Sequence, residues 1–248
     1  MKNRQRWMVQ VVGASAIAWA TCAAADEWVR ETRTMTQPFS EVRLIGALDL
    51  QLIQSEAVSL VIEADRGELP RVKSEVHDGV LTLRLDDDGP HRFLGFISKH
   101  SAPRALLSAR AIERLAVEGS GDVDAGSWTF PSAFELRVVG SGDVKFHHLA
   151  AEQLTCSVAG SGDIELAGST TGQDIRISGS GSYRAADLRS QTASVSVAGS
   201  GDAEVWVERI LDARIAGSGE VRYYGSPALK QSVLGSGSLT ALGVARSR

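Results

Sequence analysis

Apolar and polar residues alternate along most of this 248-residue chain, and glycine interrupts the alternation at regular intervals. The interruption is a four-residue motif, Gly-Ser-Gly followed by Asp, Glu or Ser, which recurs every 18–21 residues. A fixed period near 20 is typical of repeat proteins, in which each unit stacks on its neighbours. The first glycines of the seven copies are Gly119, Gly140, Gly160, Gly179, Gly199, Gly217 and Gly235.

Aliphatic residues occupy alternate positions on both sides of each motif, which is the pattern of β-strands with one buried face. Such strands, stacked in register, pair with their own copies about 4.8 Å away. The sequence therefore predicts an all-β fold, a parallel β-helix (a single-stranded β-solenoid) with rungs of about 18–21 residues. The aliphatic residues two positions before the motif are Val117, Val138, Val158, Ile177, Val197, Ile215 and Val233.

Charges alternate in sign at the outward position five residues after each first glycine. Opposite charges directly across paired strands are favourable by about 0.2–1 kcal/mol, whereas like charges are unfavourable. We therefore expect consecutive repeats to be direct neighbours, with Lys145 between two acidic side chains. The residues at this position are Asp124, Lys145, Glu165, Arg184, Glu204 and Arg222, followed by Thr240.

Acidic residues occupy the fourth position of most motifs and are the candidate binding residues. They are Asp122, Asp143, Asp163, Asp202 and Glu220. Three interpretations stay open: the carboxylates accept hydrogen bonds from turn N–H groups, hold a cation such as calcium, or contact a polar ligand such as a glycan. A polysaccharide-cleaving enzyme is the catalytic alternative, because paired glycosidase carboxylates lie about 5–9.5 Å apart.

The motif is not a dinucleotide loop, because the third glycine of G-x-G-x-x-G is missing in all seven copies. We predict no catalytic residue, no metal ligand and no cofactor, and therefore a protein that is not an enzyme. We read the glycines as corner residues. Cys156 occupies a strand position equivalent to Leu136, so we expect a buried, inert thiol.

Residues 1–25 have the features of a signal peptide: Lys2, Arg4 and Arg6, then an apolar stretch, then Ala23-Ala24-Ala25. Their removal leaves a net charge of −7, which argues against nucleic-acid binding, and no stable membrane span is expected in the mature chain. We divide the remainder into a lead (26–36), irregular leading rungs (37–110) with an insertion loop at 86–103, regular rungs (111–242) and a tail (243–248).

The chain resembles the GIN-domain family of exported bacterial proteins, described as heads of autotransporter adhesins. The segments that carry the resemblance are 39–44, 48–52 and 78–83, and the first motif with its repeated copies (115–123). The resemblance implies a right-handed β-helix in the periplasm, in the outer envelope or outside the cell. It implies a binding, adhesion or structural module rather than any one activity. Glycans or envelope proteins are the expected partners, and an open strand edge at the last rung predicts a homo-oligomer.

Overall fold

The computed structural model describes residues 28–35, 37–86 and 102–243. The predicted signal peptide, residues 87–101 of the predicted insertion and residues 244–248 of the predicted tail lie outside this part. The described chain contains one short 3₁₀ helix, Leu69–Arg71, and is otherwise built from strands and turns. The strands are β1 (Trp28–Arg33), β2 (Glu41–Gly46), β3 (Asp49–Gln54), β4 (Ser59–Asp65), β5 (Val72–His77), β6 (Val80–Leu85), β7 (Arg104–Ala109), β8 (Arg114–Gly119), β9 (Val123–Thr129), β10 (Ala133–Gly140), β11 (Val144–Gly160), β12 (Ile164–Gly179), β13 (Ser182–Gly199), β14 (Asp202–Gly217), β15 (Glu220–Tyr224), β16 (Ala228–Gly235) and β17 (Ser238–Gly243).

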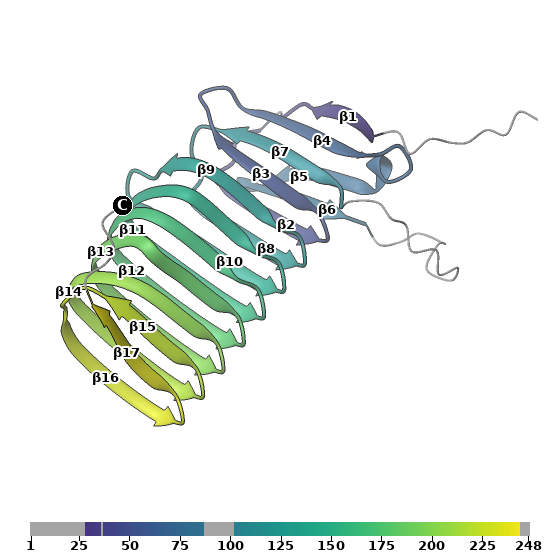
Figure 1. Ribbon diagram of the computed structural model, residues 1–248. Coiled ribbons are helices and arrows are strands. Elements are labelled where there is room, and N and C mark those ends of the chain that lie inside the picture. The colour runs from purple at the N-terminus through teal and green to yellow at the C-terminus, as the bar shows by residue number, and fades with distance from the viewer. Residues whose placement is uncertain (1–27, 36, 87–101, 244–248) are drawn as a thin grey trace, which may run out of the picture.

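The strands from β8 onward form a β-solenoid, which has about six turns in all (Figure 1). Adjacent rungs pair in parallel and in register, so that each first glycine lies beside the first glycine of the next rung, as Gly140 does beside Gly160. Lys145 is the direct partner of both Asp124 and Glu165. The predicted β-solenoid, and with it the stacking of consecutive repeats, is therefore confirmed.

The amino-terminal rungs stack in an order that differs from their order in the sequence. The rung formed by β2 and β3 lies between β8–β9 on one side and β6–β7 on the other. On the far side of β6 and β7 the sheet continues through antiparallel strands: β5 pairs with β6, β4 pairs with β7, and β1 pairs with β4. Part of the predicted lead thus forms strand β1, and the chain from β1 to β7 makes a mixed end to the parallel stack.

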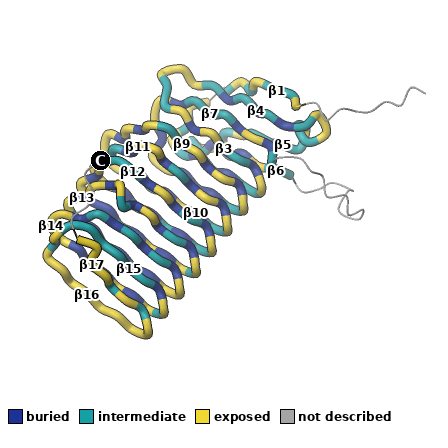
Figure 2. The backbone as a smooth tube through the Cα atoms, in the orientation of Figure 1, coloured by how far each residue is buried: buried dark blue, intermediate teal, exposed yellow. Residues whose placement is uncertain are grey.

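The core is a narrow interior filled by the inward-facing residues of each rung. Buried and exposed positions alternate along the strands, as Figure 2 shows for the middle rungs. Valine, leucine and isoleucine continue from rung to rung, and Trp128, Phe130, Phe134 and Phe146 add an aromatic cluster. Each buried aliphatic side chain contributes about 1.5–3 kcal/mol, so a few per rung stabilise the stack.

The glycine motif forms a corner where neighbouring rungs come too close for side chains. Gly140 has φ of +125°, a region that L-residues rarely adopt. A Cβ on Gly142 would lie 2.2 Å from the carbonyl oxygen of Gly121 in the preceding rung. The motif is therefore explained by backbone conformation and by inter-rung contact, as the interpretation of the glycines as corner residues predicts.

One stretch of the interior is polar and fully hydrogen-bonded. The Tyr183 hydroxyl donates to Gln173 Oε1 at 2.8 Å, and Gln173 Nε2 donates to Ser190 Oγ at 2.7 Å. Ser190 Oγ donates in turn to the carbonyl oxygen of Trp206 at 2.8 Å. Cys156 lies beside Tyr183 and is completely buried, as predicted, and this burial raises the pKa of its thiol. A neutral thiol without access to solvent is a poor nucleophile.

Candidate functional site

The aspartates after the glycine corners form a hydrogen-bonded column, called here the carboxylate ladder: Asp49, Asp122, Asp143 and Asp163. Each Oδ1 accepts the backbone N–H of the residue that follows it in the column, one rung away. The N···O distances are 3.1 Å from Asp122 N to Asp49, 2.9 Å from Asp143 N to Asp122, and 2.9 Å from Asp163 N to Asp143. The carboxylates thus offset their mutual repulsion with charge-assisted hydrogen bonds between rungs.

The carboxylate ladder ends where serine takes the place of aspartate. Asp163 Oδ1 still accepts the N–H of Ser182 at 2.9 Å, but the N–H of Asp202 turns to the carbonyl oxygen of Gly181, 3.3 Å away. Beyond the break, Asp202 Oδ1 accepts the N–H of Glu220 at 3.0 Å. Glu220 itself accepts a hydrogen bond from the side chain of Thr240 at 3.1 Å. Five predicted residues therefore share one column, in two separate hydrogen-bonded runs.

The charges that alternate in the sequence lie beside the ladder on the same outer face. Lys145 Nζ lies 2.7 Å from Glu165 Oε1, and Arg222 Nη2 lies 3.1 Å from Glu204 Oε2. Arg184 reaches sideways to the ladder instead, with its Nη1 2.7 Å from Asp163 Oδ2. Because these pairs are partly exposed, each contributes at most about 1 kcal/mol. Their main effect is to define a surface of regularly alternating sign.

A groove of about 610 Å³ runs along this face over the amino-terminal half of the stack. It contains three of the predicted binding residues, Asp122, Asp143 and Asp163, together with the first part of the charge column. Asp202 and Glu220 do not line this groove. Three of the five predicted residues therefore line the groove, and the other two lie in the same column of acids but outside the groove.

Two charged groove residues, Asp49 and Arg104, belong neither to the predicted acids of the motif nor to the predicted charge column. Asp49 begins the carboxylate ladder although it lies 73 residues before Asp122. Its signal was present: residues 46–49 read Gly-Ala-Leu-Asp, a degenerate motif that keeps the first glycine and the acid. Arg104 is the register partner of Asp49 on the neighbouring strand β7. Its exposed side chain makes no ion pair or hydrogen bond within the described chain, so its charge is available in the groove.

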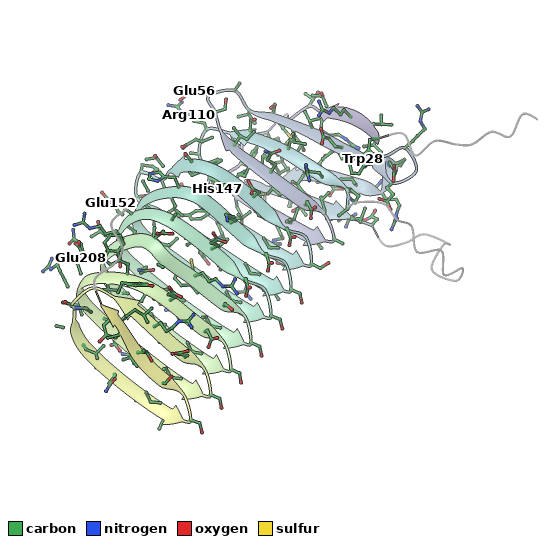
Figure 3. All side chains as sticks on the ribbon, viewed as in Figure 1. Trp28, Glu56, Arg110, His147, Glu152 and Glu208 are labelled. Carbon is green, nitrogen blue, oxygen red and sulfur yellow. The ribbon has the colours of Figure 1, made fainter. Side chains whose placement is uncertain are left out.

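The carboxylates of the ladder share one pattern of hydrogen bonding. Each ladder carboxylate has one oxygen committed to the next rung, and Asp163 is in addition paired with Arg184. Among the described residues there is no group of three or more His, Cys, Asp or Glu side chains arranged to hold a metal ion. The nearby His147 (Figure 3) pairs with one carboxylate, its Nε2 lying 3.1 Å from Asp124 Oδ2.

The family follows from a comparison with known proteins. Residues 38–227 match the model of the family described as "Putative auto-transporter adhesin, head GIN domain". The chain belongs to the GIN-domain family. This membership agrees with the resemblance seen in the sequence and suggests a surface or exported protein of the adhesin type. No protein of curated function shows significant similarity to the chain.

Solved structures of similar fold include proteins from Bacteroides and Parabacteroides species. A "putative adhesin" from Bacteroides fragilis NCTC 9343 is 20% identical, with a TM-score of 0.78 over 88% of this chain and 98% of that one. A "putative lipid binding protein" from Parabacteroides distasonis ATCC 8503 is 26% identical, with a TM-score of 0.66 over 86% and 96%. A "putative adhesin" from Parabacteroides merdae ATCC 43184 is 22% identical, with a TM-score of 0.67 over 87% and 96%. The fold is therefore shared along nearly the whole length of these proteins.

In the described part of this GIN-domain protein, no helix is long and apolar enough to cross a membrane.

Proposed function

We propose that this GIN-domain protein is an exported, non-enzymatic binding module that holds a polar ligand, such as a glycan chain, in the groove along the carboxylate ladder. The observation that carries the proposal is the composition of the groove. Its acids are already held in place by backbone N–H groups and by Arg184. The groove wall is therefore rigid and polar, and little side-chain entropy is lost when a ligand binds. Hydroxyl groups of a sugar can donate to the remaining carboxylate oxygens and accept from lysine and arginine.

Two features favour an extended ligand over a compact one. The groove follows the stack from β7 and β3 to β13, so equivalent side chains repeat along it at the rung spacing of about 4.8 Å. The charge column alternates in sign and the ladder adds further carboxylates, so the groove lining has six acidic and three basic side chains, which accept hydroxyl groups well and disfavour anionic ligands. A neutral polymer with repeated hydroxyl groups matches both features. The family's description as an adhesin head supports the same class of function.

The test is a glycan array probed with the purified chain, followed by titration of each ligand found. Asp143→Asn removes a charge inside the groove but keeps an oxygen that can accept the ladder hydrogen bond. Asp202→Asn makes the same change in the same column outside the groove, and is the matched control. We expect Asp143→Asn and Arg104→Glu to weaken binding at least tenfold and Asp202→Asn to leave it unchanged. Full binding by both groove variants contradicts the proposal.

The catalytic and calcium alternatives have their own measurements. If the protein cleaves a polysaccharide, new reducing ends or unsaturated products will accumulate during incubation with the bound glycan, and the non-enzymatic assignment is then wrong. If calcium stabilises the scaffold, the melting temperature will fall when a chelator replaces calcium. We expect neither change; for calcium, the reason is that the described residues contain no group of three or more acidic, His or Cys side chains arranged to hold a metal ion.

Export is the remaining part of the proposal. We expect the mature protein to begin at Asp26 and to be recovered from the periplasm, the outer envelope or the medium. Amino-terminal sequencing of the protein from fractionated cells tests this expectation. Recovery of the uncleaved chain from the cytoplasm contradicts it.

Lipid binding is a second candidate, favoured by one separate feature. A cavity of about 380 Å³ near the amino-terminal end is lined mainly by apolar groups, among them Met35, Phe39 and Val58. The similar protein from Parabacteroides distasonis is described as lipid binding. Co-sedimentation with liposomes distinguishes the two candidates: binding that Val58→Asp abolishes and Asp143→Asn leaves intact assigns the ligand to this cavity.

A further inference from the structure

The last rung of the solenoid is covered on one face only. Among the described strands, β16 pairs with β14 and β17 pairs with β15, and neither has a partner on its outer edge. All eight residues of β16 are exposed, in contrast to the alternation in the rungs before it (Figure 2). The row of free N–H and C=O groups along β16 is a template for a further strand.

The apolar columns of the core reach this edge without ending. Leu229 is the register partner of Leu211, and Val233 is the register partner of Ile215. Leu211 and Ile215 are 0% and 2% exposed because a rung covers them, whereas Leu229 and Val233 are 43% and 39% exposed. One more rung of the same shape would bring these two side chains to the burial of the residues beneath them.

The two ends of the sheet differ in their protection against pairing. The outer strands at the amino-terminal end, β1 and β5, include charged residues such as Arg30, Glu31 and Lys73. Charged side chains are the usual means by which proteins keep an open edge from pairing. On β16 and β17 there is one charge, Lys230, and its Nζ is drawn back to Asp212 Oδ2 at 3.5 Å. The edge at the carboxy-terminal end of the described sheet therefore carries a single charge, whereas the edge at the amino-terminal end carries several.

We propose that a second copy of this chain covers the edge, and that the two copies stack end to end about a two-fold axis with β16 antiparallel to β16. A head-to-tail arrangement would place this edge against the charged strands β1 and β5 and would leave the same edge open on the last copy. The two-fold arrangement joins two identical edges with one charge each and closes. This dimer is independent of the proposed glycan binding in the groove.

The alternation of side chains restricts the register of this pairing. Residues directly opposite in an antiparallel ladder point to the same face, so inward-facing residues must meet inward-facing residues. With Gln231 opposite the partner subunit's Gln231, Leu229 lies opposite the partner subunit's Val233, and Lys230 lies opposite the partner subunit's Ser232. A register centred on Lys230 would place two like charges opposite each other, which is unfavourable. A register centred on Ser232 would leave Leu229 facing a glycine.

Light scattering coupled to gel filtration, over a range of concentrations, tests the stacking. We expect a dimer for the wild-type chain and monomers for Leu229→Glu and for Val233→Lys. An equimolar mixture of the two variants is expected to dimerise, because one Glu–Lys pair and one Leu–Val pair then form. Val58→Lys, at an exposed apolar position at the other end (50% exposed), is the matched control and is expected to remain dimeric.

Disulfide cross-linking tests the same register without introducing a charge into β16. In the proposed pairing the two copies of residue 231 lie directly opposite, with Cα atoms about 4.5–5.5 Å apart, which suits a disulfide. Gln231→Cys is expected to give an oxidised dimer on a non-reducing gel, whereas Leu234→Cys, an exposed position on the outward face of the same strand, is not. A wild-type chain that stays monomeric at all concentrations overturns the proposal. A wild-type dimer whose variants do not recombine, or whose Gln231→Cys form does not cross-link, overturns the β16 pairing.

Discussion

Replacement of Gly142 by alanine tests the inter-rung contact on which the whole fold depends. The added Cβ would lie 2.2 Å from the carbonyl oxygen of Gly121 and 3.2 Å from Val117 Cγ1. Contacts shorter than 3.0 Å essentially do not occur, so the two rungs must separate by about 0.8 Å or more at this corner. Overpacking of this kind costs about 1–3 kcal/mol. The weakened ladder hydrogen bonds add about 0.5–1.5 kcal/mol.

The expected loss of stability is therefore about 1.5–4.5 kcal/mol, which corresponds to a decrease in Tm of about 3–18 °C for a chain of this size. Gly126→Ala is the matched control, because a Cβ there meets nothing within 4 Å. This control is expected to be neutral or more stable by about 0.4–1 kcal/mol, since alanine restricts the unfolded chain. Thermal unfolding followed by circular dichroism measures both variants. Equal melting temperatures for the two would refute the described packing at the glycine corners.

Four further outcomes follow from the described contacts. Asp143→Ser should cost no more than about 1 kcal/mol in urea unfolding, because the freed N–H can turn to a glycine carbonyl, as it does at the natural serine break. Tyr183→Phe should cost about 1–3 kcal/mol in the same assay, because it leaves the buried Gln173 Oε1 without its donor; an unchanged midpoint would contradict the polar chain. Lys145→Glu places three acids in a row and should lower stability by about 0.5–1 kcal/mol, an effect that 1 M salt removes. Cys156 should not react with a thiol reagent at pH 8 until the protein unfolds, because burial raises its pKa and keeps the reagent out; rapid labelling would contradict this.

Much of the solenoid could be predicted because its determinants are local and repeated. Val138 and Val158 read as inward residues from period-2 alternation alone, and their pairing follows once the 20-residue period is recognised. The alternating charges gave an independent check, since Lys145 is favourable only between acidic neighbours. The column of acids could be predicted for the same reason, because its members share one offset from the glycine corner.

The sequence could not decide what the carboxylates of the column contact. A carboxylate at the offset of Asp143 is compatible with turn capping, with cation binding and with ligand contact alike. The choice depends on where the N–H of the next rung points, and that direction is a property of the assembled corner. The same pattern of residues therefore left three interpretations open, of which the hydrogen bond to the backbone is the contact present in the structure.

The sequence by itself determined the repeating unit: the strands, the glycine corners, the inward columns and the outward charges, because each of these repeats a local steric or electrostatic requirement. Only the tertiary structure decided the order of the first rungs. Strands β2 and β3 lie between segments that come later in the chain, and these pairings place Asp49 beside both Asp122, 73 residues later, and Arg104 in the groove. Such long-range pairing is decided by the fit of whole rungs: the degenerate motif at residues 46–49 marks Asp49 as a corner residue but does not specify which strands lie beside it.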